Sequence, residues 1–248
     1  MPLVDSSRPT VSRGVTISQT RALTTVVWSP AINHRWPLVL LAPGYQVGPD
    51  TYAHLAQTWA AAGFVVAAPE FPLADQAVAG TALDENDLNN EPADAEFVLE
   101  SLIQPGSPVA ARIDPTRVAV TGHSDGAEVA LALGQEGRSD IKAVIAMAGQ
   151  PVVPHQAPNP PLLVIQGDQD TINPPARAQA VYDQAASPRF LLTLLGAPHL
   201  APFSGGSKWQ PVVESATTDF LNHYLAGKMT SDAAMVADAV RPGLSTLR

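Results

Sequence analysis

Short, nearly uninterrupted hydrophobic runs alternate along the chain with longer segments in which apolar residues recur every three or four positions. The first pattern is typical of strands buried on both faces, and the second is typical of helices with one buried face. Most of the 24 prolines fall between the runs, where they end elements. We therefore predict strands over residues 22–28, 37–42, 64–72, 117–122, 142–149, 161–167 and 189–195, and helices over residues 51–62, 93–103, 125–134, 175–186 and 210–225.

Strands that alternate with amphipathic helices predict an α/β fold, in which a mostly parallel sheet is covered by helices on both faces. The alternation is unbroken, so we predict a single domain over residues 1–248. Its core spans about 20–226, and residues 227–248 form a C-terminal tail with a candidate short helix over 231–240. In sheets of this class the reacting groups lie on loops at the carboxyl ends of strands.

A serine between two glycines stands where one predicted strand passes into the following helix. The segment Gly122-His123-Ser124-Asp125-Gly126 has the G-x-S-x-G pattern in the strand–turn–helix context of a nucleophile elbow. The glycines are needed because the sharp turn holds the serine in a strained conformation, in which neighbouring side chains would clash. The bare pattern arises easily by chance, so the flanking strand and helix carry the inference. Ser124 is the predicted nucleophile.

Two later loops carry the base and the orienting acid that a serine nucleophile needs. His199 follows the last predicted strand and is the predicted base, with His155 on an earlier loop as its rival. Asp168 and Asp170 both follow the preceding strand. We favour Asp170 as the acid and interpret Asp168 as a turn residue. The chain order of serine, aspartate and histidine is the one that accompanies a nucleophile elbow.

An oxyanion hole is predicted from two backbone N–H groups. One belongs to Asp125, directly after the nucleophile. The other belongs to Tyr45, in the loop that follows the strand over residues 37–42. Four further side chains flank the triad in sequence and are candidates for lining the substrate pocket, with ordinary loop packing as an equal alternative: Gln46, Ile172, Leu200 and Phe203.

Composition excludes several other chemistries. The chain has no cysteine, which removes disulfides, thiolate metal sites and cysteine nucleophiles. The 14 Lys and Arg residues against 23 Asp and Glu residues give a net charge of −9, which argues against nucleic acid or an anionic membrane as the main partner. No run approaches the roughly 20 apolar residues of a membrane span. No signal peptide is visible, so a cytoplasmic location is expected by default.

Taken together, these residues resemble the α/β-hydrolase superfamily from about Arg21 to Leu225. Within that superfamily the chain is similar to the branch of platelet-activating-factor acetylhydrolase-like, dienelactone-hydrolase-like and cutinase-type polyester hydrolases. The resemblance implies an α/β-hydrolase fold and a Ser124–His199–Asp170 triad that needs no metal or organic cofactor. It is carried by residues 20–31, 37–71, 89–102 and 114–131.

Three features depart from that branch. Dienelactone hydrolases use a cysteine nucleophile and many secreted polyester hydrolases carry a disulfide, yet this chain has no cysteine. The residue after the nucleophile is usually uncharged, whereas the carboxylate of Asp125 would oppose the charge that develops in an oxyanion hole. Glu128, one helical turn further, is interpreted as an exposed helix charge. Many lipases insert a cap where this chain has only residues 150–160, so we expect a site without a cap domain or lid.

The expected function is a serine hydrolase that cleaves carboxylic esters through an acyl-enzyme, at an open site that favours short-chain or accessible esters. Polyester hydrolase, thioesterase, lactonase and cofactor-free perhydrolase are alternatives on the same triad. A non-catalytic hydrolase-fold module that binds a ligand is the alternative from a different class. The expected partner is a small or polymeric ester, and the sequence leaves the oligomeric state open.

Overall fold

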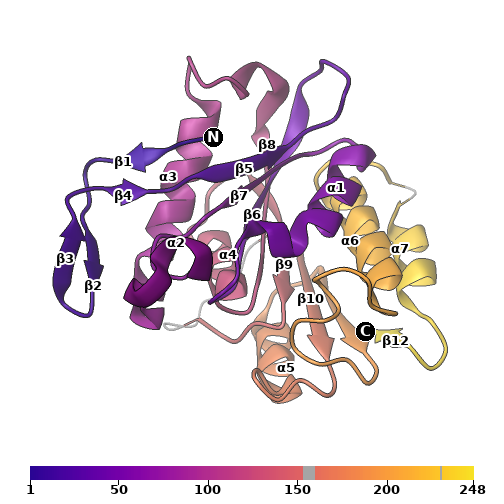
Figure 1. Ribbon diagram of the computed structural model, residues 1–248. Coiled ribbons are helices and arrows are strands. Elements are labelled where there is room, and N and C mark those ends of the chain that lie inside the picture. The colour runs from indigo at the N-terminus through magenta and orange to yellow at the C-terminus, as the bar shows by residue number, and fades with distance from the viewer. Residues whose placement is uncertain (153–159, 230) are drawn as a thin grey trace.

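A central sheet organises the computed structural model, which describes residues 1–152, 160–229 and 231–248 (Figure 1). In this part of the chain the sheet has eight strands. From one edge to the other they are β12 (Ser245–Leu247), β11 (Arg189–Leu194), β10 (Leu162–Gly167), β9 (Ile141–Met147), β8 (Ile113–His123), β6 (Trp36–Ala42), β7 (Val65–Pro69) and β5 (Thr25–Trp28).

The inner strands, from β11 to β7, all run parallel to their neighbours, whereas the two edge strands are antiparallel. The strand expected over residues 22–28 is divided into β4 (Arg21–Ala22), which lies outside the sheet, and β5. The other edge was not expected, because β12 comes from the C-terminal tail and pairs Leu247 with Leu192 of β11. The tail thus completes the sheet.

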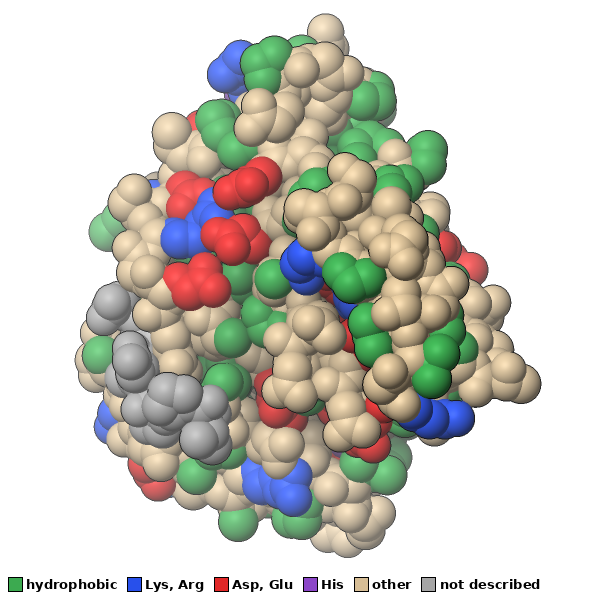
Figure 2. All heavy atoms as spheres, turned by 90° about the vertical axis from the view of Figure 1, so that its left-hand side faces the viewer, with side chains coloured by type: hydrophobic (Ala, Val, Ile, Leu, Met, Phe, Trp, Pro, Cys, Tyr) green, Lys and Arg blue, Asp and Glu red, His purple; other side chains and the backbone are tan. Residues whose placement is uncertain are grey.

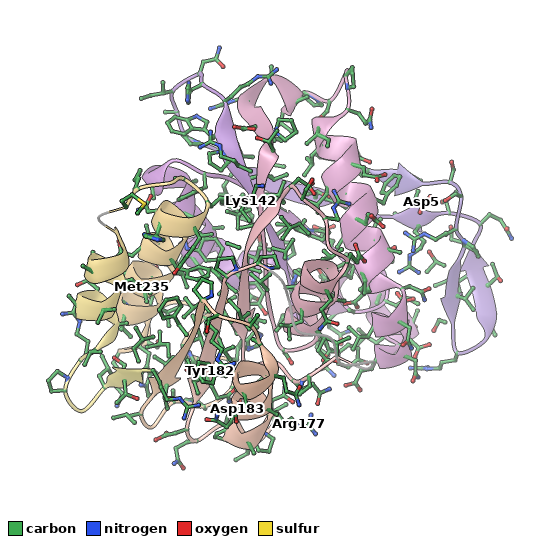
Figure 3. All side chains as sticks on the ribbon, turned by 180° about the vertical axis from the view of Figure 1, so that it is seen from behind. Asp5, Lys142, Arg177, Tyr182, Asp183 and Met235 are labelled. Carbon is green, nitrogen blue, oxygen red and sulfur yellow. The ribbon has the colours of Figure 1, made fainter. Side chains whose placement is uncertain are left out.

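Helices cover both faces of the sheet. The side chains of α3 (Glu91–Ile103), α4 (Asp125–Gln135) and α5 (Pro175–Gln184) join one core cluster, and those of α1 (Ala53–Ala62), α6 (Gln210–Tyr224) and α7 (Ser231–Ala239) join the other. Alternate residues of β6 face the two clusters, with Leu38 on one side and Val39 on the other. Met235 of α7 is fully buried (Figure 3). The predicted α/β-hydrolase fold is confirmed.

Several short elements lie outside this frame. Two small antiparallel pairs, β1 (Val4–Asp5) with β4 and β2 (Thr10–Ser12) with β3 (Val15–Ser18), project beside α3 (Figure 1). Elements of two to four residues are too short to show a hydrophobic period, so β1, β2 and β3 were not predicted, and β4 was expected only as part of a longer strand. The remaining short helices are α2 (Gln76–Ala79), η1 (Pro49–Tyr52), η2 (Gly80–Ala82), η3 (Glu85–Asn89) and η4 (Ala110–Arg112).

A buried guanidinium ties the N-terminal segment to α3. Arg21 is 1% exposed, and its Nε lies 2.7 Å from Asp94 while its Nη2 lies 2.7 Å from Asp87. Arg8 adds a contact of 2.6 Å to Asp94 and another of 2.7 Å to Asp5. Arg21, Asp87 and Asp94 are buried, and Figure 2 shows the surface of this side of the molecule, where other acidic side chains gather around basic ones.

Replacing Arg21 with methionine is expected to lower the free energy of unfolding by about 3–5 kcal/mol, because the buried carboxylate of Asp87 loses its guanidinium partner and that of Asp94 keeps only Arg8. Burial raises the pKa of Asp94 even beside Arg21, and loss of the guanidinium will raise that pKa further. The carboxyl then takes up a proton as the pH falls, so the loss should be smaller at pH 5 than at pH 8. Urea unfolding at both pH values measures the effect, with exposed Arg35→Met as control. An equal loss at both pH values would contradict the expected linkage.

The connection between β9 and β10 includes residues 153–159, which lie outside the described residues. The rival base His155 and much of the expected cap-free segment therefore lie there, and both remain predictions. In the described ranges, no helix is both long and apolar enough to cross a membrane.

Candidate active site

The predicted site residues gather where four parallel strands of the sheet have their carboxyl-terminal ends. Tyr45 follows β6, Ser124 follows β8, Asp170 follows β10 and His199 follows β11. The carboxyl ends of parallel strands lie side by side at one end of the sheet, so segments far apart in the sequence come together there.

Ser124 occupies a sharp turn between β8 and α4 with φ 56° and ψ −123°, a conformation that non-glycine residues rarely adopt. Its N–H donates to the carbonyl of Met147 on the neighbouring strand at 2.9 Å. A Cβ on Gly122 would lie 1.9 Å from the carbonyl oxygen of Gly126, and a Cβ on Gly126 would lie 2.0 Å from that of Ala42. Backbone packing therefore allows only glycine two positions before and after the serine.

Asp170 lies against His199 and is held by several donors. His199 Nδ1 donates to Asp170 Oδ2 at 2.7 Å, and Gln166 Nε2 donates to the same oxygen at 3.0 Å. The N–H groups of Ile172 and Asn173 both donate to Oδ1 at 2.9 Å. Because an ionised carboxylate only accepts hydrogen bonds, the proton of the His199 ring resides on Nδ1. Nε2 is left as the ring nitrogen that can accept a proton from a nucleophile.

The other aspartate of this loop has a different position. Asp168 Oδ1 accepts a hydrogen bond of 2.6 Å from the N–H of Gly196, in the loop that leads to His199. Asp168 thus bridges two loops, and Asp170 is the aspartate that meets the imidazole. This geometry distinguishes between two residues that sequence analysis placed at the end of the same strand.

Two amide side chains that sequence analysis missed support the acid. Gln166 is 1% exposed and lies in β10, where its Nε2 bonds both Asp170 and the carbonyl of Asn173. Asn173 is 6% exposed and donates from Nδ2 to the carbonyl of Ala148 at 2.7 Å. A polar residue in an otherwise apolar strand, four positions before the acid, was the available signal for Gln166.

The two predicted oxyanion donors lie on loops that touch. In the first loop, Gly44 N–H donates to the Tyr52 hydroxyl at 3.2 Å and Gln46 N–H to the carbonyl of Ala74 at 2.7 Å, while the intervening Tyr45 N–H bonds no described atom. In the second loop, Asp125 is the first residue of α4, where backbone N–H groups have no partner within the helix.

The four candidate lining residues differ in exposure. Gln46 is exposed, Ile172 is 65% exposed and Leu200 is half-buried, so all three offer surface around the site. Phe203 is only 2% exposed, and its ring centroid lies 5.0 Å from that of His123. The structure therefore corrects the expectation for Phe203, which packs beneath the site and presents almost no surface to a substrate.

Two carboxyl groups at the start of α4 have raised pKa values. Burial, reinforced by Glu85, raises the pKa of Asp125 to about 6, although His199 opposes the shift. Burial also raises the pKa of Glu128 to about 7, with Asp125 contributing. Glu128 is half-buried, so its interpretation as an exposed helix charge was wrong. The site consequently gains negative charge as the pH rises through the neutral range.

The Asp125→Asn variant is expected to raise kcat/KM for a neutral ester about fivefold at pH 8, which corresponds to about 1 kcal/mol of relieved repulsion of the oxyanion. The pKa of about 6 means that the carboxyl is charged at pH 8 and mostly neutral at pH 5. The ratio of variant to native rates should therefore approach one as the pH falls to 5. Initial rates across this range measure the ratio, with Glu100→Gln, an exposed carboxylate on α3, as the control. A ratio that is independent of pH would contradict the electrostatic explanation.

No metal centre is formed by the described side chains, since no three His, Asp or Glu groups among them are placed to hold an ion. Two buried aromatic side chains do lie beneath the site. Tyr52 and His123 are 0% and 2% exposed, and the Tyr52 hydroxyl lies 2.9 Å from His123 Nδ1. The G-x-S-x-G pattern gives no sign of His123, because it leaves the residue before the serine unspecified, and Tyr52 lies outside the pattern.

Comparisons with known proteins match the chain to one family model and to several cutinases. The family described as chlorophyllase matches residues 8–164. Cutinase 1 of Thermobifida cellulosilytica and a cutinase of Thermobifida fusca (strain YX) are each 34% identical to the chain over 186 residues, which is 71% of this chain. Cutinase 2 of Thermobifida cellulosilytica is 32% identical over the same length. The matches span 65% of the length of the first of these relatives and 56% of the second.

Proposed function

Since the chain belongs to the chlorophyllase family, within the α/β-hydrolase fold, we propose that it is a serine hydrolase of carboxylic esters. The observation that carries the proposal is the strained Ser124 at the start of α4, at the same carboxyl-terminal end of the sheet as the Asp170–His199 pair. The cutinase relatives support the same reaction class.

In the proposed reaction, the Ser124 hydroxyl attacks the ester carbonyl while its proton passes to His199 Nε2. Asp170 keeps the other ring proton on Nδ1 and stabilises the cationic ring that forms. The carbonyl oxygen becomes an oxyanion, which receives hydrogen bonds from the N–H groups of Tyr45 and Asp125. These bonds act where charge develops in the transition state, so they lower the barrier.

The tetrahedral intermediate then collapses. His199 gives its proton to the leaving alkoxide, which departs as the alcohol and leaves an acyl group on Ser124. A water molecule attacks this acyl-enzyme with His199 again as the base, and the carboxylic acid is released. Each proton gained by His199 is returned, so this scheme uses only side chains and backbone groups of the chain together with water.

A fluorophosphonate probe tests the function directly, because its phosphorus is attacked by an activated serine hydroxyl with loss of fluoride. We expect one phosphonate on the peptide that contains Ser124, and none on that peptide in the Ser124→Ala variant. Peptide mass spectrometry of the labelled protein identifies the site. Absence of labelling in the folded native protein would favour the non-catalytic ligand-binding module and overturn the proposal.

A polyester hydrolase is the second candidate, favoured by the cutinase relatives and by the 65% exposure of Ile172 beside the acid loop. An accessible rim can admit an ester within a long chain. Rates on p-nitrophenyl esters with acyl groups of two to sixteen carbons, together with acid release from a polyester film, compare the two substrate classes. Short-chain turnover without release from the film would reject this candidate.

A further inference from the structure

Three hydrogen bonds form a chain beneath the triad. The N–H of Gly44 donates to the Tyr52 hydroxyl at 3.2 Å, and this hydroxyl lies 2.9 Å from His123 Nδ1. On the other side of the ring, His123 Nε2 lies 3.0 Å from the carbonyl oxygen of His199. Tyr52 and His123 are 0% and 2% exposed, so water does not compete for these bonds.

The groups at the two ends of this series of hydrogen bonds determine the direction of every bond in it. A carbonyl oxygen only accepts, so His123 Nε2 carries the ring proton and donates to His199. Nδ1 is then the acceptor and the Tyr52 hydroxyl donates to it, while that hydroxyl accepts from Gly44. Every group is satisfied with His123 neutral. Burial and the neighbouring His199 lower the pKa of His123 to about 3, so the same arrangement holds at neutral pH.

Each bond ends at or next to a group that the reaction uses. Gly44 precedes the predicted oxyanion donor Tyr45, His123 precedes the nucleophile Ser124, and the last acceptor is the backbone of His199 itself. A Cβ on Gly44 would lie 3.1 Å from Ser124 Cβ, so the two loops are already in close contact. The ring centroids of His123 and His199 are 4.7 Å apart. This series of hydrogen bonds thus joins three loops that are distant in sequence.

We propose that Tyr52 and His123 are positioning residues for ester hydrolysis, which hold the Tyr45 N–H, Ser124 and His199 in one mutual arrangement. This inference rests on the proposed ester-hydrolase function. Reacting groups displaced by about 1 Å can lose about 100-fold in rate. The groups held here act mainly in the transition state, so their displacement should lower kcat more than it changes KM.

Tyr52→Phe removes the hydroxyl and keeps the buried ring. We expect kcat for a short p-nitrophenyl ester to fall about 10- to 100-fold, with KM changed less than about threefold. Tyr182→Phe is the matched control, because Tyr182 lies on α5 with its ring beneath Arg189 and Arg248 and should keep native kcat (Figure 3). Native kcat in folded Tyr52→Phe would overturn the proposal.

Substitutions at His123 test whether the two residues act as one unit. His123→Gln can still accept from Tyr52 and donate to His199, so it should retain much more kcat than His123→Leu, which can do neither. The double variant Tyr52→Phe/His123→Leu should be scarcely slower than His123→Leu alone, because His123→Leu already removes the hydrogen bonds through which Tyr52 acts. Equal kcat in the Gln and Leu variants, or fully multiplicative losses, would assign both residues to packing alone.

Probe labelling separates this inference from the proposed function. If the native protein does not react with a fluorophosphonate, the proposed ester-hydrolase function is rejected independently of Tyr52 and His123. If the native protein reacts and turns over ester, the folded variants decide the inference, with thermal unfolding confirming that they are folded. Should Tyr52→Phe not fold, the comparison of His123→Gln with His123→Leu decides the question by itself.

Discussion

Ser124→Ala will lower kcat for ester hydrolysis by about 10⁴- to 10⁶-fold, with little change in stability. The variant lacks the oxygen that attacks the carbonyl, so no acyl-enzyme can form. The oxyanion donors of the backbone remain and account for a residual rate. Alanine keeps a Cβ at φ 56°, so the strain of the turn is unchanged. Initial rates on a short p-nitrophenyl ester and urea unfolding measure the two effects.

Two companion variants sharpen that experiment. Ser124→Gly should be equally inactive yet more stable by about 1 kcal/mol, because glycine adopts a positive φ without strain. Ser18→Ala, on the exposed strand β3, removes a hydroxyl far from the site and should retain native kcat. Retained hydrolysis in Ser124→Ala would reject Ser124 as the nucleophile.

Asp170→Asn is expected to lower kcat by about 10⁴-fold. Two backbone N–H groups, from Ile172 and Asn173, donate to Oδ1, so the amide oxygen of asparagine must occupy that position. The amide NH₂ then takes the place of Oδ2, where it loses the hydrogen bond from Gln166 and donates to His199 Nδ1. The ring proton therefore moves to Nε2. In that tautomer the ring cannot accept the proton of Ser124.

Asp168→Asn is the matched control for this substitution. Its carboxylate meets the N–H of Gly196 and not the imidazole, so the variant should lose less than about threefold in kcat. Rates of both variants under identical conditions, with thermal unfolding to confirm folding, make the comparison. A larger loss in Asp168→Asn than in Asp170→Asn would reverse the assignment of the acid.

Long hydrophobic patterns predicted the main elements well, because a strand or helix buried against the sheet must be apolar at a regular period. The inner strands and the helices over residues 93–103, 125–134 and 210–225 lie close to their expected ranges. The edge strand β12 could not be predicted, since its three residues show no period. Its place depends on pairing with β11, far from it in sequence.

The site was predictable wherever local geometry imposes a residue type. The turn at Ser124 needs glycine at 122 and 126, because a Cβ at either position would lie within about 2 Å of backbone oxygen. The supporting side chains had no such local requirement. Asn173, Tyr52 and His123 owe their roles to partners on other loops, so the segments that surround them did not indicate a role in the site. Gln166 bonds the acid loop directly after its own strand, and its polarity within an apolar strand was the one local sign of its role.

By itself, the sequence determined the α/β class and the order in which a serine, an aspartate and a histidine follow buried strands, because hydrophobic period and turn sterics are local. Only the tertiary structure decided that Asp170 and not Asp168 meets His199, and that Phe203 is buried. It also decided that Tyr52 and His123 connect Gly44 to His199. These hydrogen bonds and the burial of Phe203 arise between loops that only the folded sheet brings into contact, so they leave no periodic pattern in the sequence.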